Sequence, residues 1–293
     1  MSTTSTYKSL MDLHPREVKN FVKDVPTLPV IYQELFAKMQ DPNVAVPEIA
    51  EIITHDQALS TKILHLVNSA FYGYSKQIKT ISRAVVILGF RAVRSAALAT
   101  SVFDYFKDEE DGSVDMMDFW KHSIAVASIC KVLAEELNIN QKEEAFVVGL
   151  LHDIGKLVEK RYFDEDFREV CTVAREQHLS WIECEKALFQ TDHANIGKAV
   201  FRGWNFPPSV IDAVQFHHTP NASAKVPQLT SLVHVADFIS YQIDFGAPGA
   251  FPPRECSPEA LKMLGLTLPD TLRFHDKIRE ELEVAMEILK LLD

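Results

Sequence analysis

The chain contains 293 residues, of which 47% are hydrophobic and 24% are charged, so it is long enough to bury a substantial core. Its formal net charge of −11 argues against nucleic-acid backbone binding as the main activity, because such binding needs clustered lysine and arginine. No apolar stretch could span a bilayer and no secretion signal opens the chain, so we expect a soluble, cytoplasmic protein without membrane contact. The four cysteines form no C-x-x-C pair and predict neither disulfides nor a thiolate metal site.

The first third of the chain predicts a polar leader over residues 1–23 and a compact helical subdomain over residues 24–108. In the subdomain, apolar residues recur at a spacing of three to four, which is the pattern of amphipathic helices. Asp56 is expected to cap one helix, and Gly89 is expected to separate two others by a turn. The expected helices cover residues 29–39, 47–53, 56–69, 81–88 and 90–103.

The acidic run at residues 108–113 reads as a solvated loop and marks a domain boundary, since its spacing does not match a calcium loop. A larger helical core is expected over residues 114–246, and a loop followed by one helix over residues 247–293. No alternating apolar run is long enough to demand a sheet, so the predicted fold is all-α. The expected helices cover residues 119–137, 142–157, 163–178, 182–189, 193–204, 208–217, 226–245 and 272–292.

The apolar stripe along the last expected helix favours packing on the body of the protein. Formation of a homodimer through the same stripe is the less favoured alternative.

The segment 149–157, Gly-Leu-Leu-His-Asp-Ile-Gly-Lys-Leu, places an adjacent His152-Asp153 pair on an expected apolar helix. An imidazole and a carboxylate there are suitable metal ligands, and the nearby Lys156 cation is placed to hold the anionic group of a substrate. Asp153 and Lys156 are therefore the candidate catalytic residues. The alternative for the isolated dipeptide is a satisfied polar pair near a helix end.

Further histidine and aspartate residues recur on the successive helices of the second half. Two adjacent histidines reach one metal only near a helix end, which Pro220 supplies after His217 and His218. Asp237 lies inside an apolar helix and must be paired, because a bare buried carboxylate costs several kcal/mol. Each residue alone has an ordinary structural explanation, but the ordered set favours a metal site. The seven candidate ligands are His122, His152, Asp153, His193, His217, His218 and Asp237.

Several segments, together with the ordered histidines and aspartates, carry a resemblance to a known family. The segments are Leu28-Pro29, residues 52–59 (IITHDQAL), 64–73 (LHLVNSAFYG), 81–89 (ISRAVVILG) and 149–155 (GLLHDIG). Over residues 25–241 the chain resembles the HDOD family, the HD-related output domain of the HD superfamily of metal-dependent phosphohydrolases. The resemblance implies an N-terminal subdomain of short helices packed on an HD-type helical core. It also implies a bacterial protein of signalling or gene regulation, often without known catalysis.

The resemblance implies two divalent transition-metal ions, of iron, manganese, nickel, cobalt or zinc. Many HDOD members lack several metal positions, whereas this chain retains all of them. Related cyclic-di-GMP phosphodiesterases follow their His-His pair with an acidic residue and Gly-Tyr-Pro, whereas residues 219–223 here read Thr-Pro-Asn-Ala-Ser, which argues against that substrate. By position, one metal would be held by His122, His152, Asp153 and Asp237, and the other by Asp153, His193, His217 and His218.

Two functions remain open from the sequence. The favoured one is a signalling or regulatory output module that binds divalent metal and presents Asn68, Ser69 and Tyr72 to a regulatory protein partner. Complete ligands can persist as a metal sensor or a structural site without turnover. The alternative is a metal-dependent phosphohydrolase or nucleotide phosphodiesterase, with a nucleotide or another phosphate as its ligand.

Overall fold

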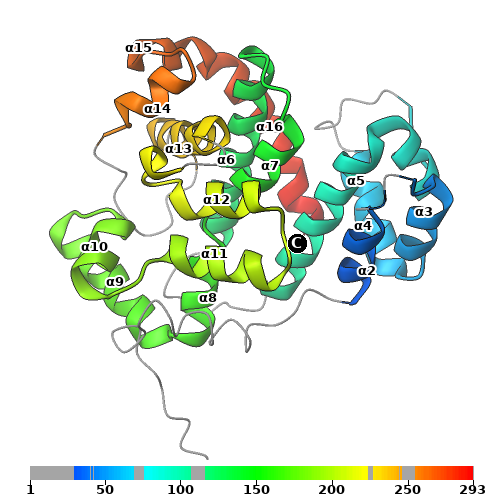
Figure 1. Cartoon of the computed structure of the whole chain (residues 1–293), viewed down its shortest axis with the longest axis horizontal. Helices are drawn as coiled ribbons and strands as arrows, with labels where there is room; N and C mark the ends of the chain where they lie inside the picture. The colour runs from blue at the N-terminus through cyan, green and yellow to red at the C-terminus, as the bar shows by residue number, and fades with distance from the viewer. Residues whose placement is uncertain are drawn as a thin grey trace, which may run out of the picture.

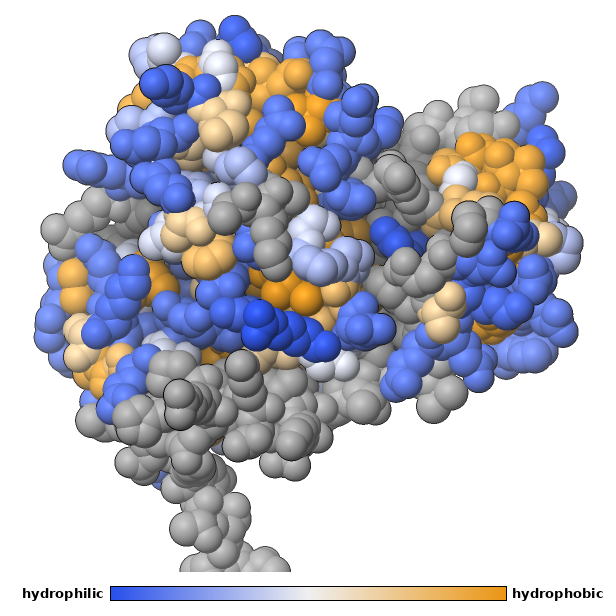
Figure 2. Space-filling model, viewed as in Figure 1, coloured by the Kyte–Doolittle hydropathy of each residue, from blue (hydrophilic) through white to orange (hydrophobic). Residues whose placement is uncertain are grey.

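The computed structural model describes residues 30–39, 41, 43–68, 76–106, 116–223, 227–243, 245 and 255–292. Within these ranges all regular secondary structure is helical, which confirms the predicted all-α class. The expected leader over residues 1–23 lies outside them. Figure 1 shows the first helices grouped on the right of the molecule and the later helices in a larger group on the left. Figure 2 shows hydrophilic residues over much of the coloured surface, with hydrophobic patches between them.

The N-terminal group is built from short helices that pack on one long helix, as the apolar spacing predicts. Its helices are α2 (Val30–Met39), α3 (Val46–Thr54), α4 (Gln57–Val67) and α5 (Ile81–Phe106). The first three all contact α5, and they bury Ile49, Ile53 and Ile63 between them. The Asp56 carboxylate accepts a hydrogen bond of 2.9 Å from the N–H of Leu59, which confirms the expected helix cap.

Gly89 interrupts α5 where the sequence predicts a turn between two helices. Its backbone lies at φ 83° and ψ 163°, a conformation that residues with a Cβ atom rarely adopt. The two helical segments therefore join at Gly89 without a longer loop. The second segment reaches the larger group, where α5 packs on α7 (Lys142–Leu151).

The larger group is organised around α6 (Met116–Glu136), which is buried along most of its length. This burial explains why the helix has no polar face in its sequence. Helix α6 contacts α7, α13 and α16. The remaining helices of the core are α8 (Ile154–Tyr162), α9 (Asp164–Gln177), α10 (Trp181–Leu188), α11 (His193–Gly203), α12 (Pro208–Phe216) and α13 (Pro227–Gln242).

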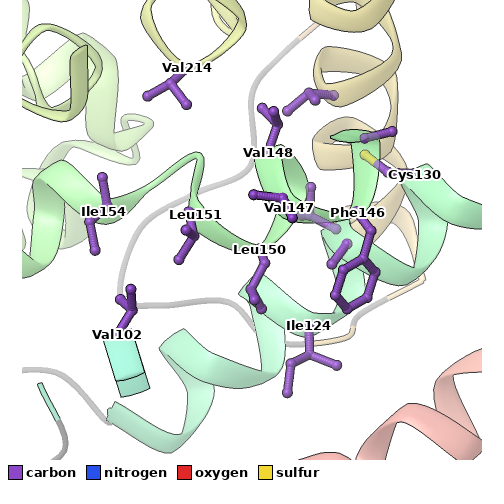
Figure 3. Packing of buried hydrophobic residues seen from close by; sticks show 14 of the residues in the cluster. Val102, Ile124, Cys130, Phe146, Val147, Val148, Leu150, Leu151, Ile154 and Val214 are labelled. Atoms are coloured by element: carbon purple, nitrogen blue, oxygen red, sulfur yellow. The ribbon is translucent and has the colours of Figure 1, made fainter. Parts of the chain in front are cut away.

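The prediction of a single helix over residues 142–157 is wrong, because two helices meet there at the His152-Asp153 pair. Helix α7 ends at Leu151 and α8 begins at Ile154, with Asp153 at φ −96° and ψ 11°. Figure 3 shows the side chains of Leu151 and Ile154 on the two sides of this junction, within the buried apolar cluster. Apolar residues continue through the junction, so the hydrophobic pattern alone does not reveal the break.

The C-terminal region contains two short helices that the sequence analysis missed, α14 (Pro258–Met263) and α15 (Leu268–Thr271). Helices of this length give too few residues for a periodic pattern. The predicted last helix begins as a 3-10 turn (Leu272–Phe274) and continues as α16 (His275–Leu292). It packs on α6 and buries Ile278, Leu282 and Ala285, as expected from its stripe. In the part of the chain that the structure describes, no helix is long and apolar enough to cross a membrane.

Gly155 provides a test of the close packing between α8 and α11. A Cβ atom on Gly155 would lie 2.7 Å from the carbonyl carbon of His193 and still closer to its oxygen. We expect Gly155→Ala to lower the free energy of unfolding by roughly 3 kcal/mol, because backbone atoms must move apart. Urea denaturation followed by circular dichroism measures this loss.

Gly197→Ala is the matched control, because its added Cβ would meet side-chain methyls of Val214 at 3.0 Å and Ile154 at 3.4 Å, with the Gly155 backbone nitrogen at 3.8 Å. We expect a much smaller loss there. Equal losses in the two variants would contradict the importance of the α8–α11 backbone contact.

Candidate metal centre

The structure brings all seven predicted ligands together in two neighbouring groups, within each of which the ligand atoms lie within 4.8 Å of one another. The first ligand group consists of His122, His152 and Asp237. The second ligand group consists of Asp153, His193, His217 and His218. Their side chains come from α6, the α7–α8 junction, the start of α11, the end of α12 and the middle of α13. Metal binding by them stays a prediction, which the following geometry supports.

Asp153 lies between the two groups and directs one carboxylate oxygen to each. Its Oδ2 is 3.4 Å from His152 Nε2 and 3.7 Å from His122 Nε2, in the first group. Its Oδ1 is 3.2 Å from His193 Nε2 and 3.8 Å from His217 Nε2, in the second group. The side chain is 1% exposed. This arrangement is the one that a ligand shared by two metal ions requires.

Helix ends place most of these side chains. His152 follows the last residue of α7, and His217 follows the last residue of α12, shortly before Pro220 begins a short 3-10 helix (Pro220–Ala222). His193 is the first residue of α11, where the Asp192 carboxylate caps the helix by accepting a 2.8 Å hydrogen bond from the N–H of Asn195. Ligands at helix ends can approach one point from several directions, which ligands along one helix face cannot do.

Three of the five ligand histidines have their Nδ1 atoms against carbonyl or carboxylate oxygens. His152 Nδ1 lies 2.7 Å from the carbonyl oxygen of Gly149, and His217 Nδ1 lies 2.7 Å from that of Val214. His193 Nδ1 lies 2.7 Å from Glu185 Oε2. An N–H at each Nδ1 satisfies these contacts and leaves the Nε2 lone pair to face the centre.

His122 follows the same rule through a hydroxyl group. The Ser240 hydroxyl donates to the carbonyl oxygen of Asp237 at 2.7 Å, so its oxygen is free to accept from His122 Nδ1 at 3.2 Å. The Nε2 atom of His122 then lies 3.2 Å from Asp237 Oδ1. The oxygen atoms that face the Nδ1 atoms therefore select the tautomer that metal binding needs, with the Nε2 lone pair free.

Within the described ranges, four buried ligand atoms make no hydrogen bond of acceptable geometry: His122 Nε2, His152 Nε2, Asp153 Oδ1 and Asp237 Oδ1. His122 Nε2 and Asp237 Oδ1 lie 3.2 Å apart, but without hydrogen-bond alignment. Leaving such polar atoms buried costs about 1–3 kcal/mol each. Divalent metal ions would satisfy them, and a shell of imidazoles and carboxylates without thiolates suits transition metals. The residues present therefore fit the group that the family resemblance implies.

The electrostatics of the centre favour charged carboxylates and mostly neutral imidazoles. Burial raises the pKa of Asp237, but the nearby His122 and His152 outweigh it and lower the value to about 2. Burial, aided by neighbouring histidines, lowers the pKa of His217 and His218 well below the ordinary value. Neutral imidazoles and ionised carboxylates are the forms that ligate metals.

Lys156 places a buried cation against the shared carboxylate. Its Nζ donates a hydrogen bond of 2.6 Å to Asp153 Oδ2 and lies 5.5 Å from the ring centroid of Trp181. Burial alone would lower the pKa of Lys156, but the charge of Asp153 outweighs burial and raises it. The lysine therefore remains protonated, as a role in holding an anionic group demands.

Glu185 is the site residue that the sequence analysis missed. It lies on α10, is fully buried, and accepts a hydrogen bond from His193 Nδ1. Trp181 Nε1 also donates to it, at 3.0 Å. A glutamate four residues after a tryptophan carries no recognisable ligand pattern, and its contact with His193 depends on the packing of α10 against the start of α11. Residue type and spacing therefore gave no signal for it.

The structure describes only one of the three residues predicted to face a protein partner. The Asn68 amide nitrogen donates to the carbonyl oxygens of Leu64 and Ile78, both at 2.7 Å, and its oxygen accepts from the N–H of Ile78 at 2.6 Å. Asn68 thus ties the end of α4 to the segment that precedes α5. Ser69 and Tyr72 lie outside the described residues, and the partner surface stays a prediction.

Metal binding should strengthen as the pH rises toward 9. Burial lowers the pKa of His193, but the Glu185 carboxylate outweighs burial and raises it to about 9 in the metal-free protein. A proton and a metal ion compete for His193 Nε2, so affinity should fall by about tenfold per pH unit below that value. Calorimetric titration at pH 7 in buffers of different ionisation enthalpy should detect a released proton, and metal uptake without proton release would contradict this account.

Comparison with known proteins finds relatives that match two thirds or more of this chain. An uncharacterised protein of Treponema pallidum is 26% identical over 235 residues, which are 80% of this chain and 45% of that protein. Ribonuclease Y of Mycoplasmoides gallisepticum is 26% identical over 212 residues, which are 67% of this chain and 31% of that protein. The chain thus spans less than half the length of these curated relatives.

Two solved structures share the fold across nearly their whole length. An HDOD domain protein of unknown function from Geobacter sulfurreducens has a TM-score of 0.79 and 24% identity, covering 94% of this chain and 99% of that one. A candidate phosphohydrolase from Shewanella amazonensis has a TM-score of 0.75 and 27% identity, covering 94% of this chain and 98% of that one. The HDOD domain family itself matches residues 25–220, more than half of the sequence, and the chain therefore belongs to the HDOD family.

Proposed function

We propose that this chain binds two divalent transition-metal ions at the two ligand groups and hydrolyses a phosphoester there. The observation that carries the proposal is the position of Asp153, with one oxygen toward each ligand group and Lys156 at 2.6 Å. The inward Nε2 atoms of the surrounding histidines complete two adjacent ligand sets.

When bound, two divalent ions would supply the Lewis acidity that polarises a phosphoryl group and lowers the pKa of a water nucleophile. Side chains of the protein would orient the reacting groups and offset the negative charge of the phosphoryl oxygens. Asp153 holds the two sets in register, and the Lys156 ammonium group offers positive charge beside them. The transferring group carries its charge on phosphoryl oxygens, so a fixed cation at this place lowers the barrier.

The relatives narrow the substrate that we propose. The Shewanella amazonensis protein is named for phosphoester hydrolysis, and Ribonuclease Y for cleavage of RNA. A phosphodiester is therefore the preferred class. The net charge of −11 disfavours a long nucleic-acid backbone and favours a small nucleotide.

A second function, a regulatory module with a metal sensor or structural metal, is favoured by the burial of the centre. Six of the seven ligands are 3% exposed or less, and only His218 is half-buried, so a substrate has a narrow approach. In that role the N-terminal helices would bind a signalling or regulatory protein. Metal binding without hydrolysis of any phosphodiester would favour this function over the first.

Elemental analysis of protein purified without chelator tests the metal centre. We expect about two equivalents of transition metal in the wild type, because two complete ligand sets are present. Asp153→Asn should lose both ions, and Asp237→Asn should lose the ion of the first ligand group only. Asp192→Asn is the matched control, since asparagine also caps helices and the Asp192 side chain caps α11 by accepting from the N–H of Asn195. A wild type without metal would overturn the proposed function.

Hydrolysis of bis(p-nitrophenyl) phosphate and of a panel of cyclic and linear dinucleotides tests the activity. Lys156→Gln should keep both metal ions but lower the rate about 10²-fold, because one fixed positive group is removed from the developing charge. Lys142→Gln, a change in an exposed lysine at the start of α7, should leave the rate unchanged. Equal rates for Lys156→Gln and wild type would rule out the proposed role of Lys156.

A further inference from the structure

The Glu185 carboxylate is fully buried and accepts three hydrogen bonds from two neighbours, Trp181 and His193. Its Oε1 accepts hydrogen bonds from Trp181 Nε1 and from the backbone N–H of His193, both at 3.0 Å. Its Oε2 contacts His193 Nδ1 at 2.7 Å. A buried charge with this many hydrogen bonds is held in one orientation, and so is the imidazole that donates to it.

Neutral oxygen atoms face the Nδ1 atoms of three other ligand histidines. Carbonyl oxygens lie behind His152 and His217, and the Ser240 hydroxyl lies behind His122. Among these four histidines, His193 alone has a carboxylate at its Nδ1. A carboxylate makes an imidazole a stronger electron donor than a neutral acceptor does. The two ligand groups are therefore chemically unequal, although each contains histidine and aspartate.

We propose that Glu185 is a positioning residue that fixes the tautomer and orientation of His193 and so sets the metal affinity of the second ligand group alone. The inference rests on the proposed function only in requiring that this group binds metal. The Glu185 carboxylate would then be the reason why the two ligand groups bind their ions with different affinities. The predicted result is a sequential filling of the centre.

The number of donors around Glu185 explains why glutamine cannot replace it. A glutamine side chain has one acceptor oxygen, and the Trp181 and His193 N–H groups both need that oxygen. Its NH₂ group would then face His193 Nδ1 and donate to it. The ring proton would move to Nε2, the atom that must be free to bind metal.

Titration with Zn²⁺ against a chromophoric chelator, in the full-length protein, tests this inference. We expect two binding constants in the wild type, and Glu185→Gln should weaken one of them by about 10–100-fold and leave the other unchanged. Glu183→Gln is the matched control on the same helix, because the Glu183 carboxylate accepts hydrogen bonds from the backbone N–H and the hydroxyl of Ser180 at the start of α10. It should leave both constants unchanged.

The outcomes separate this inference from the proposed function. Two unchanged constants in Glu185→Gln, or an equal loss in both, would overturn the selective role of Glu185 while leaving the metal centre in place. A wild type that binds no zinc would overturn both.

A second measurement needs no variant at position 185 and covers the case in which Glu185→Gln does not fold. Long-range ¹H–¹⁵N spectra of the zinc-loaded wild type should place the His193 ring proton on Nδ1. A proton on Nε2 would overturn the inference.

Discussion

The buried carboxylate of Asp153 constrains the whole centre, because an ionised group in the interior costs several kcal/mol unless charges and donors surround it. The fold surrounds it with Lys156 on one oxygen and His193 near the other. Helices from distant parts of the sequence must meet at this point to supply these partners. Because the helix breaks at the α7–α8 junction, the Asp153 carboxylate can face both ligand groups at once.

Around that carboxylate, the protein controls the direction of the imidazoles through their second nitrogen atoms. Backbone carbonyl oxygens at the ends of α7 and α12 hold His152 and His217, and the Ser240 hydroxyl holds His122. These contacts are made by the helices themselves, so the orientation of each ligand follows directly from the packing. Because the rings are held before any ion arrives, little side-chain entropy is lost on binding.

The N-terminal helices and the HD-type core are connected through a contact that lies close to the ligands. Helix α5 packs on α7, and α7 ends at Leu151, immediately before the first ligand of the His-Asp pair. Gly89 lets the α5 chain turn without a loop, which keeps this contact compact. Asn68, directly after α4, bonds to the backbone of Ile78, shortly before α5 begins. The two parts of the fold are thus joined by the packing of α5 on α7, next to the ligands.

Local spacing and residue type are sufficient to predict the all-α class, most helix positions, the cap at Asp56, the break at Gly89 and the identities of the ligand candidates. The break within residues 142–157 and the oxygen atom that faces each histidine Nδ1 depend on packing and could be found only in the folded protein. The tertiary structure also revealed Glu185, which meets His193 only when α10 packs beside the start of α11. Contacts between helices depend on three-dimensional packing, and no periodicity within a single helix records them.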